Sequence, residues 1–291
     1  MAGHMNAFDF FPARVATSAV VFASPHSGRI YAPEFLKASV LDETALRSSE
    51  DAYVDLFLQD APDHGAPVLL GGVPRAYVDY NRAATELDPA LIADVPKATL
   101  NPRVMSGLGV IPRVVAGSRA IYAGKITRTE ADTRLTRFWH PYHERLASVM
   151  DQQRRQFGRA ILFDMHSMPR DATSHDRRFA GRRPDIVLGD RFGAACSGPI
   201  SDAAEAVFSA AGLRVARNAP FAGAYITQRY GSPSTGQHVV QVEIDRGLYL
   251  DERTVTPNRD FNSFARVMAR IVKELADIGR DSNQTIALAA E

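Results

Sequence analysis

The sequence predicts a three-layer α/β/α fold with a mostly parallel, mixed central sheet. Short apolar runs of strand length alternate with longer segments of helical periodicity, which is typical of helices packed on both faces of a largely parallel sheet. Two of the apolar runs, Ala19–Ala23 and Ala160–Phe163, break abruptly into polar residues. Open α/β sheets bind ligands outside the carboxyl ends of their strands, so these two breaks predict the place of the functional site.

The remaining strands and helices follow from the same periodicities. Further strands are expected at Pro67–Leu70, Ala76–Tyr80, Asp185–Leu188, Leu213–Ala216 and His238–Ile244. Helices are expected from Thr44 or Ser49 to Asp60, and over Thr129–Phe157, Ser201–Ala211 and Phe261–Ile278. Pro141 should kink or split the second of these helices, because proline removes a helix hydrogen bond and clashes with the preceding turn.

Two segments lack periodicity and are expected to be irregular. Residues 84–127 form a long insertion with several prolines and glycines, and Phe221–Gly236 is a Gly/Ser/Pro-rich loop. No clear linker divides the chain, so we expect one domain over residues 1–291. Residues 1–5, Met-Ala-Gly-His-Met, resemble the remnant of an expression tag more than a targeting segment.

The composition does not indicate a protein that binds nucleic acid or membranes. Lys+Arg 34 against Asp+Glu 33 leave a net charge of +1, so no bulk field would attract the chain to nucleic acid or to a membrane surface. No apolar run approaches the roughly 18 residues of a membrane span. The one cysteine, Cys196, excludes an internal disulfide and a cysteine-based zinc site, and a cytoplasmic location is expected.

Two histidines follow the two strands that end in polar residues. His26 lies in Ser24-Pro-His-Ser-Gly28, and His166 lies two residues after Asp164 in Asp-Met-His-Ser. Imidazole is a common zinc ligand, and a catalytic zinc uses three protein ligands and keeps one position open for water. A single histidine in such a turn more often only fixes its loop, but two in matching turns favour a shared metal. Asp164 could orient His166 through a hydrogen bond, or could cap the loop.

The third ligand should be a carboxylate from the helix expected after the first strand. Glu50 and Asp51 are adjacent there, and about 100° apart on a helix, so only one of them could face a metal. The alternative is a solvated acidic pair near the helix N-terminus, which the helix dipole favours. On spacing alone the two interpretations are about equally supported.

Glu243 is the candidate general base. It lies among apolar residues in the expected strand His238–Ile244, where a lone carboxylate is costly unless it has a partner or a task. Beside a zinc-bound water it could accept a proton. The alternative is a buried salt bridge to Arg246 or Arg229.

Arginines are the candidate ligands for an anionic substrate. Arg82 follows Asn81 directly after the expected strand Ala76–Tyr80, and a guanidinium can pair with a carboxylate through two parallel hydrogen bonds. Arg229, in the Phe221–Gly236 loop, is the second candidate. Most arginines are solvated surface residues, so either one alone is weak evidence.

Six short motifs together resemble the N-formylglutamate amidohydrolase family. They are Ser24–Gly28 (SPHSG), Tyr77–Arg82 (YVDYNR), Trp139–His143 (WHPYH), Leu162–Ser167 (LFDMHS), Phe221–Thr227 (FAGAYIT) and Gln241–Glu243 (QVE). They occur in the family's order between about Val20 and Glu252. Six motifs in register are far more specific than any one of them.

The resemblance implies a fold similar to zinc carboxypeptidases and aspartoacylase-type deacylases. In those enzymes two histidines and one acidic residue bind zinc, a glutamate on a late strand is catalytic, and an Asn-Arg pair binds a substrate carboxylate. It therefore implies His26 and His166 as zinc ligands, Glu243 as base, and Asn81 and Arg82 as carboxylate binders. Carboxypeptidases have a glutamate three residues after the first histidine; this chain has Arg29 there, and the family pattern favours Asp51 over Glu50.

The resemblance also implies an activity. The expected reaction is zinc-dependent removal of a small N-acyl group from an acidic amino acid, with N-formyl-L-glutamate giving formate and glutamate at the end of histidine degradation. Two alternatives remain open at this point. One is a deacylase or carboxypeptidase that acts on another N-acyl amino acid or a short peptide, and the other is a non-catalytic binding domain of the same fold.

Overall fold

A mixed sheet of seven strands forms the centre of the part of the chain that the computed structural model describes, residues 5–96, 101–174, 179 and 183–280. The strands are β1 (Phe8–Phe11), β2 (Val20–Ser24), β3 (Val68–Gly71), β6 (Ala160–Met168), β7 (Ile186–Gly189), β8 (Val215–Arg217) and β9 (Gln237–Asp245). Their order is β1-β3-β2-β6-β9-β7-β8. The four central strands, β3, β2, β6 and β9, are parallel, whereas β1 and β7 run antiparallel to their neighbours β3 and β9.

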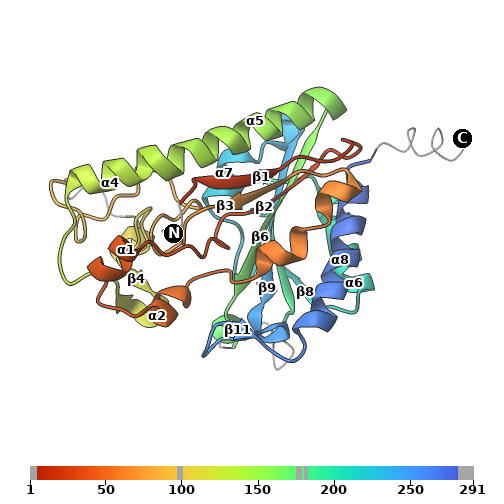
Figure 1. Cartoon of the computed structure of the whole chain (residues 1–291). Helices are drawn as coiled ribbons and strands as arrows, with labels where there is room; N and C mark the ends of the chain where they lie inside the picture. Colours follow the sequence, from red (N-terminus) through yellow and green to blue (C-terminus); the bar gives the residue numbers. More distant parts are fainter. Residues whose placement is uncertain (1–4, 97–100, 175–178, 180–182, 281–291) are drawn as a thin grey trace, which may run out of the picture.

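Helices cover both faces of this sheet, which confirms the predicted three-layer α/β/α fold (Figure 1). One face packs on η1 (Val54–Leu58), η2 (Ala61–His64), α6 (Gly198–Ala210) and α8 (Phe261–Ile278). The other packs on α4 (Arg128–Arg134), the π-helix η4 (Leu135–Trp139), α5 (His140–Phe157) and α7 (Tyr225–Tyr230). Alternation along β2 divides the core, because Phe22 belongs to the first layer and Val21 to the second. No described helix is long and apolar enough to cross a membrane.

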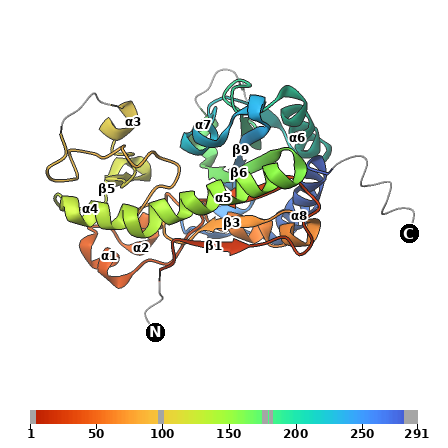
Figure 2. The ribbon, with the colours of Figure 1, turned by 90° about the horizontal axis from the view of Figure 1, so that it is seen from above.

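The insertion 84–127 stands to one side of the sheet (Figure 2). Its described part contains α3 (Pro102–Met105) and the short hairpin of β4 (Val114–Val115) and β5 (Arg119–Ala120), joined by turns. The other short elements are α1 (Pro33–Ala38), α2 (Glu43–Arg47), η3 (Ala116–Ser118), η5 (Arg170–Thr173), η7 (Pro233–Thr235), η8 (Arg246–Leu248), β10 (Leu250–Asp251) and β11 (Thr256–Pro257). Of the domain expected over residues 1–291, residues 1–4, 97–100, 175–178, 180–182 and 281–291 lie outside the described residues.

The helix expected from Thr44 or Ser49 to Asp60 was wrong, because the chain forms two short helices, α2 and η1, with a turn between them. Arg246 donates hydrogen bonds to the carbonyl oxygens of Ser48 (3.0 Å) and Glu50 (2.5 Å), which a continuous helix would use itself. Tyr53 then takes a left-handed conformation (φ 65°), which ends any helical run. Asp51 is therefore held on a turn.

Two further sequence predictions were wrong. Ala76–Tyr80 is not a strand, because the amides of Tyr77 and Val78 both bond to the carbonyl of Pro74 and close a turn. The Phe221–Gly236 loop contains the helix α7. Pro141 does not split its helix either. It falls in the first turn of α5, directly after the π-helical turn η4, so α4, η4 and α5 run on as one rod (Figure 1).

This rod supports the turn that carries Arg82. The indole Nε1 of Trp139 donates to the carbonyl oxygen of Arg82 (2.9 Å), and His143 Nε2 donates to that of Tyr80 (2.9 Å). His143 Nδ1 is then the acceptor for the Tyr230 hydroxyl on α7 (2.9 Å). Burial lowers the pKa of His143 to about 4, so the ring stays neutral and keeps both bonds.

The lowered pKa of His143 predicts a loss of stability in mild acid. In the unfolded chain the histidine pKa is near 6.5, so between pH 6.5 and 4 the unfolded chain binds a proton at this residue and the folded chain does not. The free energy of unfolding therefore falls as the pH falls. At pH 5 this amounts to about 2 kcal/mol relative to pH 7.5. Urea unfolding at the two pH values should show that His143→Gln loses about 2 kcal/mol less than the unaltered protein.

The matched control is the neighbouring His140, which is exposed on the same helix. His140→Gln should keep most of the pH dependence of the unaltered protein, because the charge of His140 is only the smallest of the causes that lower the pKa of His143. Equal pH dependence in all three proteins would contradict the role assigned to His143.

Candidate metal centre and substrate cavity

The parallel sheet brings His26 and His166 together. β2 pairs with β6 so that Ala23 lies opposite Asp164. His26 follows β2, whereas His166 lies within β6, which runs on to Met168 and does not end at Phe163 as expected from the sequence. Their ring centroids are 4.8 Å apart, and the two side chains are almost completely buried. This confirms the expectation that two distant histidines meet at one edge of the sheet.

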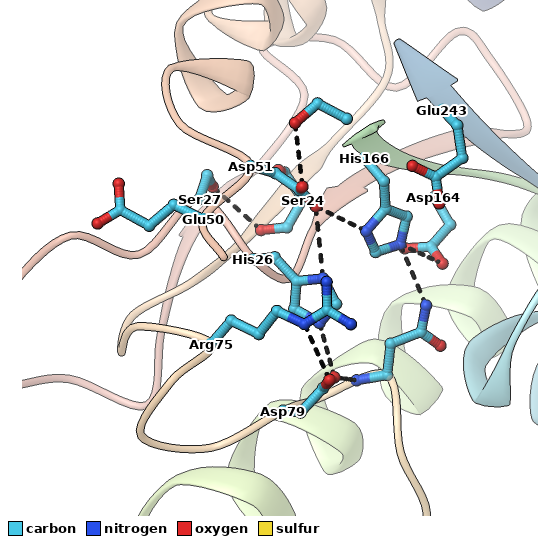
Figure 3. Close-up of polar contacts among 12 residues, drawn as sticks. Ser24, His26, Ser27, Glu50, Asp51, Arg75, Asp79, Asp164, His166 and Glu243 are labelled. Atoms are coloured by element: carbon cyan, nitrogen blue, oxygen red, sulfur yellow. Dashed lines mark hydrogen bonds and ion pairs between the residues drawn. The ribbon is translucent and has the colours of Figure 1, made fainter. Parts of the chain in front are cut away.

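Asp51 completes the group. Its Oδ2 atom lies 2.9 Å from His166 Nδ1 and 3.4 Å from His26 Nδ1, and the three candidate ligand atoms lie within 4.8 Å of one another. Its other oxygen, Oδ1, accepts hydrogen bonds from Ser167 Oγ (3.0 Å) and from Arg246 (3.3 Å). One carboxylate oxygen is thus anchored and the other faces both imidazole rings (Figure 3).

The Nε2 atom of each ring contacts a further carboxylate, which is a different residue for each histidine. His26 Nε2 lies 2.7 Å from Asp79 Oδ1, and His166 Nε2 lies 2.9 Å from Asp164 Oδ2 (Figure 3). Because a carboxylate can only accept, His26 Nε2 carries a proton, and the other ring nitrogen, Nδ1, is the one that faces Asp51. Such carboxylate–histidine pairs orient the ligands of metal sites. Asp164 therefore lies where it can orient His166, as one of the two sequence interpretations had it.

The donor set fits a divalent cation. Two imidazole nitrogens and one carboxylate oxygen are a common set of protein ligands for a catalytic zinc. His26 Nδ1 is buried and makes no hydrogen bond among the described residues, although an imidazole nitrogen in such a place needs a partner. These residues could therefore hold a metal ion.

The electrostatics of the group favour a positive charge at its centre. Burial raises the pKa of Asp51, but the hydrogen bond from His166 and the proximity of His26 outweigh burial and hold this pKa well below its usual range. Burial alone would lower the pKa of His166. Asp164 and Asp51 together have the larger effect and raise this pKa well above its usual range. Asp51 therefore stays ionised, and either ring protons or a cation must balance its charge.

Glu50 faces away from this centre. Its carboxylate pairs with the guanidinium of Arg47 (3.1 Å), while the adjacent Asp51 lies between the histidines. Of the two carboxylates that spacing left open, Asp51 is the one that lies between the two histidines.

Glu243 lies beside the histidines on the next strand. β6 and β9 pair so that His166 is opposite Glu243, and the Glu243 carboxylate accepts a hydrogen bond from Gln241 Nε2 (2.8 Å). Burial raises the pKa of Glu243 to about 7, against the opposing charge of His166. In the described part of the chain it forms no ion pair with Arg246 or Arg229, so the salt-bridge alternative finds no support there.

A cavity of about 630 Å³ opens onto these groups. Its lining includes the centre, Glu243, Asn81 and Arg82, and residues of the insertion between Arg103 and Ser118. Asn81 Nδ2 lies 3.2 Å from His166 Nε2, and its Oδ1 accepts from the amide of Ile226 at the start of α7 (2.8 Å). The Asn-Arg pair therefore lies next to the candidate metal ligands.

Arg229 is not brought to the cavity. It is exposed on α7, with its guanidinium 5.8 Å from the ring centroid of Tyr230. Sequence reasoning missed two other arginines of the cavity wall, Arg75 and Arg103. Arg75 donates to Asp79 Oδ2 (3.0 Å), and its position four residues before Asp79 was an available signal. Arg103 lies in the aperiodic insertion, where no pattern singled it out.

Comparison with known proteins supports the resemblance seen in the sequence. The family model for N-formylglutamate amidohydrolase matches residues 18–250. The chain is 29% identical over 261 residues to the N-formylglutamate deformylase of Pseudomonas aeruginosa, covering 89% of this chain and 91% of that protein. It is 28% identical over 234 residues to that of Pseudomonas putida, covering 80% and 82%.

Solved structures agree with the sequence comparison. The crystal structure of N-formylglutamate amidohydrolase from Ralstonia eutropha JMP134 is similar with a TM-score of 0.85 at 30% identity, covering 94% of this chain and 98% of that one. A gene product of Agrobacterium tumefaciens shares the fold, with a TM-score of 0.64 at 16% identity and coverage of 98% and 95%. With its fold, its His26–Asp51–His166 centre and a family match over most of its length, the chain belongs to the N-formylglutamate amidohydrolase family.

Proposed function

We propose that the protein is a zinc-dependent amidohydrolase that cleaves N-formyl-L-glutamate into formate and glutamate. The observation that carries the proposal is the buried His26–Asp51–His166 group with Glu243 beside it, opening onto a cavity whose wall is rich in arginine. The names of the two Pseudomonas relatives support the choice of substrate. In this proposal the reaction is the last step of a histidine degradation route.

The three ligand atoms would be Nδ1 of both histidines and Oδ2 of Asp51. Zinc bound there would supply Lewis-acid polarisation of the formyl carbonyl and a water of lowered pKa. With an ion bound, Asp79 and Asp164 would accept the Nε2 protons and so leave each Nδ1 free to act as the ligand atom. Ser167 and Arg246 hold Asp51 Oδ1, so that Oδ2 remains directed at the rings.

Glu243 would move the proton. Its carboxylate, oriented by Gln241, accepts a proton from the attacking water as the water oxygen bonds to the formyl carbon. It then donates that proton to the amide nitrogen as the carbon–nitrogen bond breaks, which gives formate and the free amine. A pKa raised by burial suits a group that must accept and then release a proton near neutral pH.

Arg82 and Asn81 would bind the carboxylate nearest the scissile bond. Arg82 is almost completely buried, and two hydrogen bonds fix it, one from NH1 to the carbonyl of Asn81 (2.7 Å) and one from Nε to that of Leu108 (3.1 Å). A guanidinium fixed in this way orients an anionic substrate before attack, which lowers the entropic part of the barrier.

The purified, zinc-loaded protein should release formate from N-formyl-L-glutamate. Dialysis against a chelator should abolish turnover, and added Zn²⁺ should restore it. N-acetyl-L-glutamate, N-formyl-L-methionine and a dipeptide ending in glutamate should be poor substrates. Faster cleavage of one of these would favour the alternative deacylase or carboxypeptidase, and no cleavage of any would favour the binding domain.

Glu243→Gln tests the assignment of the base. The amide has nearly the same size but cannot accept the proton, so kcat should fall by about 10²- to 10⁴-fold while the zinc content per chain is unchanged. Glu274→Gln, the same change at an exposed position on α8, is the control and should be as active as the unaltered protein. An undiminished kcat in the Glu243 variant would remove Glu243 from the mechanism.

A further inference from the structure

The charged side chains around the cavity do not balance. Four arginines line it, Arg75, Arg82, Arg103 and Arg246, against the carboxylates of Asp51, Asp79 and Glu243. Arg75 pairs with Asp79 and Arg246 with Asp51. Among the described residues, neither Arg82 nor Arg103 lies within ion-pair distance of a carboxylate. A divalent cation would add to this positive excess, which suits a ligand with two negative charges.

Arg82 and Arg103 belong to one connected piece of the cavity wall. Arg82 Nε donates to the carbonyl oxygen of Leu108 (3.1 Å), and the amide of Leu108 donates to the carbonyl oxygen of Arg103 (2.8 Å). The side chain of Asn101 caps the first turn of α3 by accepting from the amide of Arg103 (2.9 Å), and its amide group bonds to Glu86. The backbone that carries Arg103 is thus fixed relative to Arg82.

Arg103 differs from the other arginines of the insertion. Arg113 pairs with Asp88 (2.9 Å), and Arg119 donates to Ser48 Oγ (2.9 Å). The guanidinium of Arg103 makes no hydrogen bond or ion pair within the described residues, although it lines the cavity. Burial lowers the pKa of Arg82, and the positive charges of Arg75 and Arg103 add to this effect against the opposing charge of Asp79, so Arg103 already influences Arg82 across the cavity wall. An anion placed between them would relieve that repulsion.

We propose that Arg103 binds the second carboxylate of the substrate and so selects N-formyl amino acids with an acidic side chain. This inference rests on the proposed function and deepens it. The α-carboxylate is close to the formyl nitrogen and must bind near the metal centre, where Arg82 follows Asn81. The side-chain carboxylate then extends toward the insertion, where Arg103 is exposed at the cavity wall. The role first given to Arg229 thus passes to Arg103.

The test compares N-formyl-L-glutamate with N-formyl-L-glutamine, which has an uncharged amide in place of the side-chain carboxylate. In the zinc-loaded protein, Arg103→Met should lower kcat/KM for N-formyl-L-glutamate by about 10- to 100-fold, mostly through KM, because a charge-assisted hydrogen bond to a partly solvated group is lost. kcat/KM for N-formyl-L-glutamine should not change. Arg103→Lys should restore part of the preference, since it keeps the charge without the forked geometry.

The control is Arg270→Met, the same change at an exposed arginine of α8, which should leave both substrates unaffected. An equal fall in kcat/KM for both substrates in Arg103→Met would indicate a structural role. An unchanged kcat/KM for both would exclude Arg103 from binding. Either result would overturn the inference. If the unaltered protein cleaves neither substrate, the proposed function fails by itself. In that case calorimetric titration with glutarate, which has two carboxylates, and butyrate, which has one, tests the inference. The inference requires that Arg103→Met weaken glutarate binding at least about tenfold and leave butyrate binding unaffected.

Discussion

The structure depends on one carboxylate, that of Asp51, placed between two imidazole rings. Oδ2 faces His26 and His166, while Oδ1 accepts from Ser167 and Arg246. Arg246 also donates to the carbonyls of Ser48 and Glu50, just before Asp51, and so fastens this turn to the end of β9. Burying this many charges is favourable only when each has its partner, which couples the geometry of the centre to the packing of the sheet.

The sequence was sufficient to predict the fold class and the meeting of His26 and His166 at one edge of the sheet. Strand-length apolar runs that end in polar residues can be recognised locally in the sequence. When such strands pair in parallel, the polar residues at their ends lie close together, which is why His26, His166 and Glu243 could be named as candidates. The acidic residue beside the two histidines could not be chosen from a local sequence pattern. Spacing left Glu50 and Asp51 about equal, because the choice depends on a turn that Arg246, almost 200 residues away, holds open.

The cavity wall was much less predictable than the centre. Arg229 resembled a substrate ligand because it lies in a Gly-rich loop, but a short helix forms there and leaves it exposed. Arg103 gave no signal, because its position depends on hydrogen bonds between turns of the insertion and on Leu108. The position of a side chain at the end of a strand can be predicted from periodicity and strand order. The position of a side chain on irregular backbone depends on tertiary contacts that the sequence pattern does not show.

The most direct measurement of the central claim is anomalous diffraction at the zinc absorption edge from crystals of the zinc-loaded protein. The account predicts one peak at about 2.0–2.2 Å from Nδ1 of His26, Nδ1 of His166 and Oδ2 of Asp51, with a fourth position open toward the cavity and Glu243. A zinc-loaded crystal with no peak among these three atoms, or with the ion held through Glu50 in place of Asp51, would contradict it.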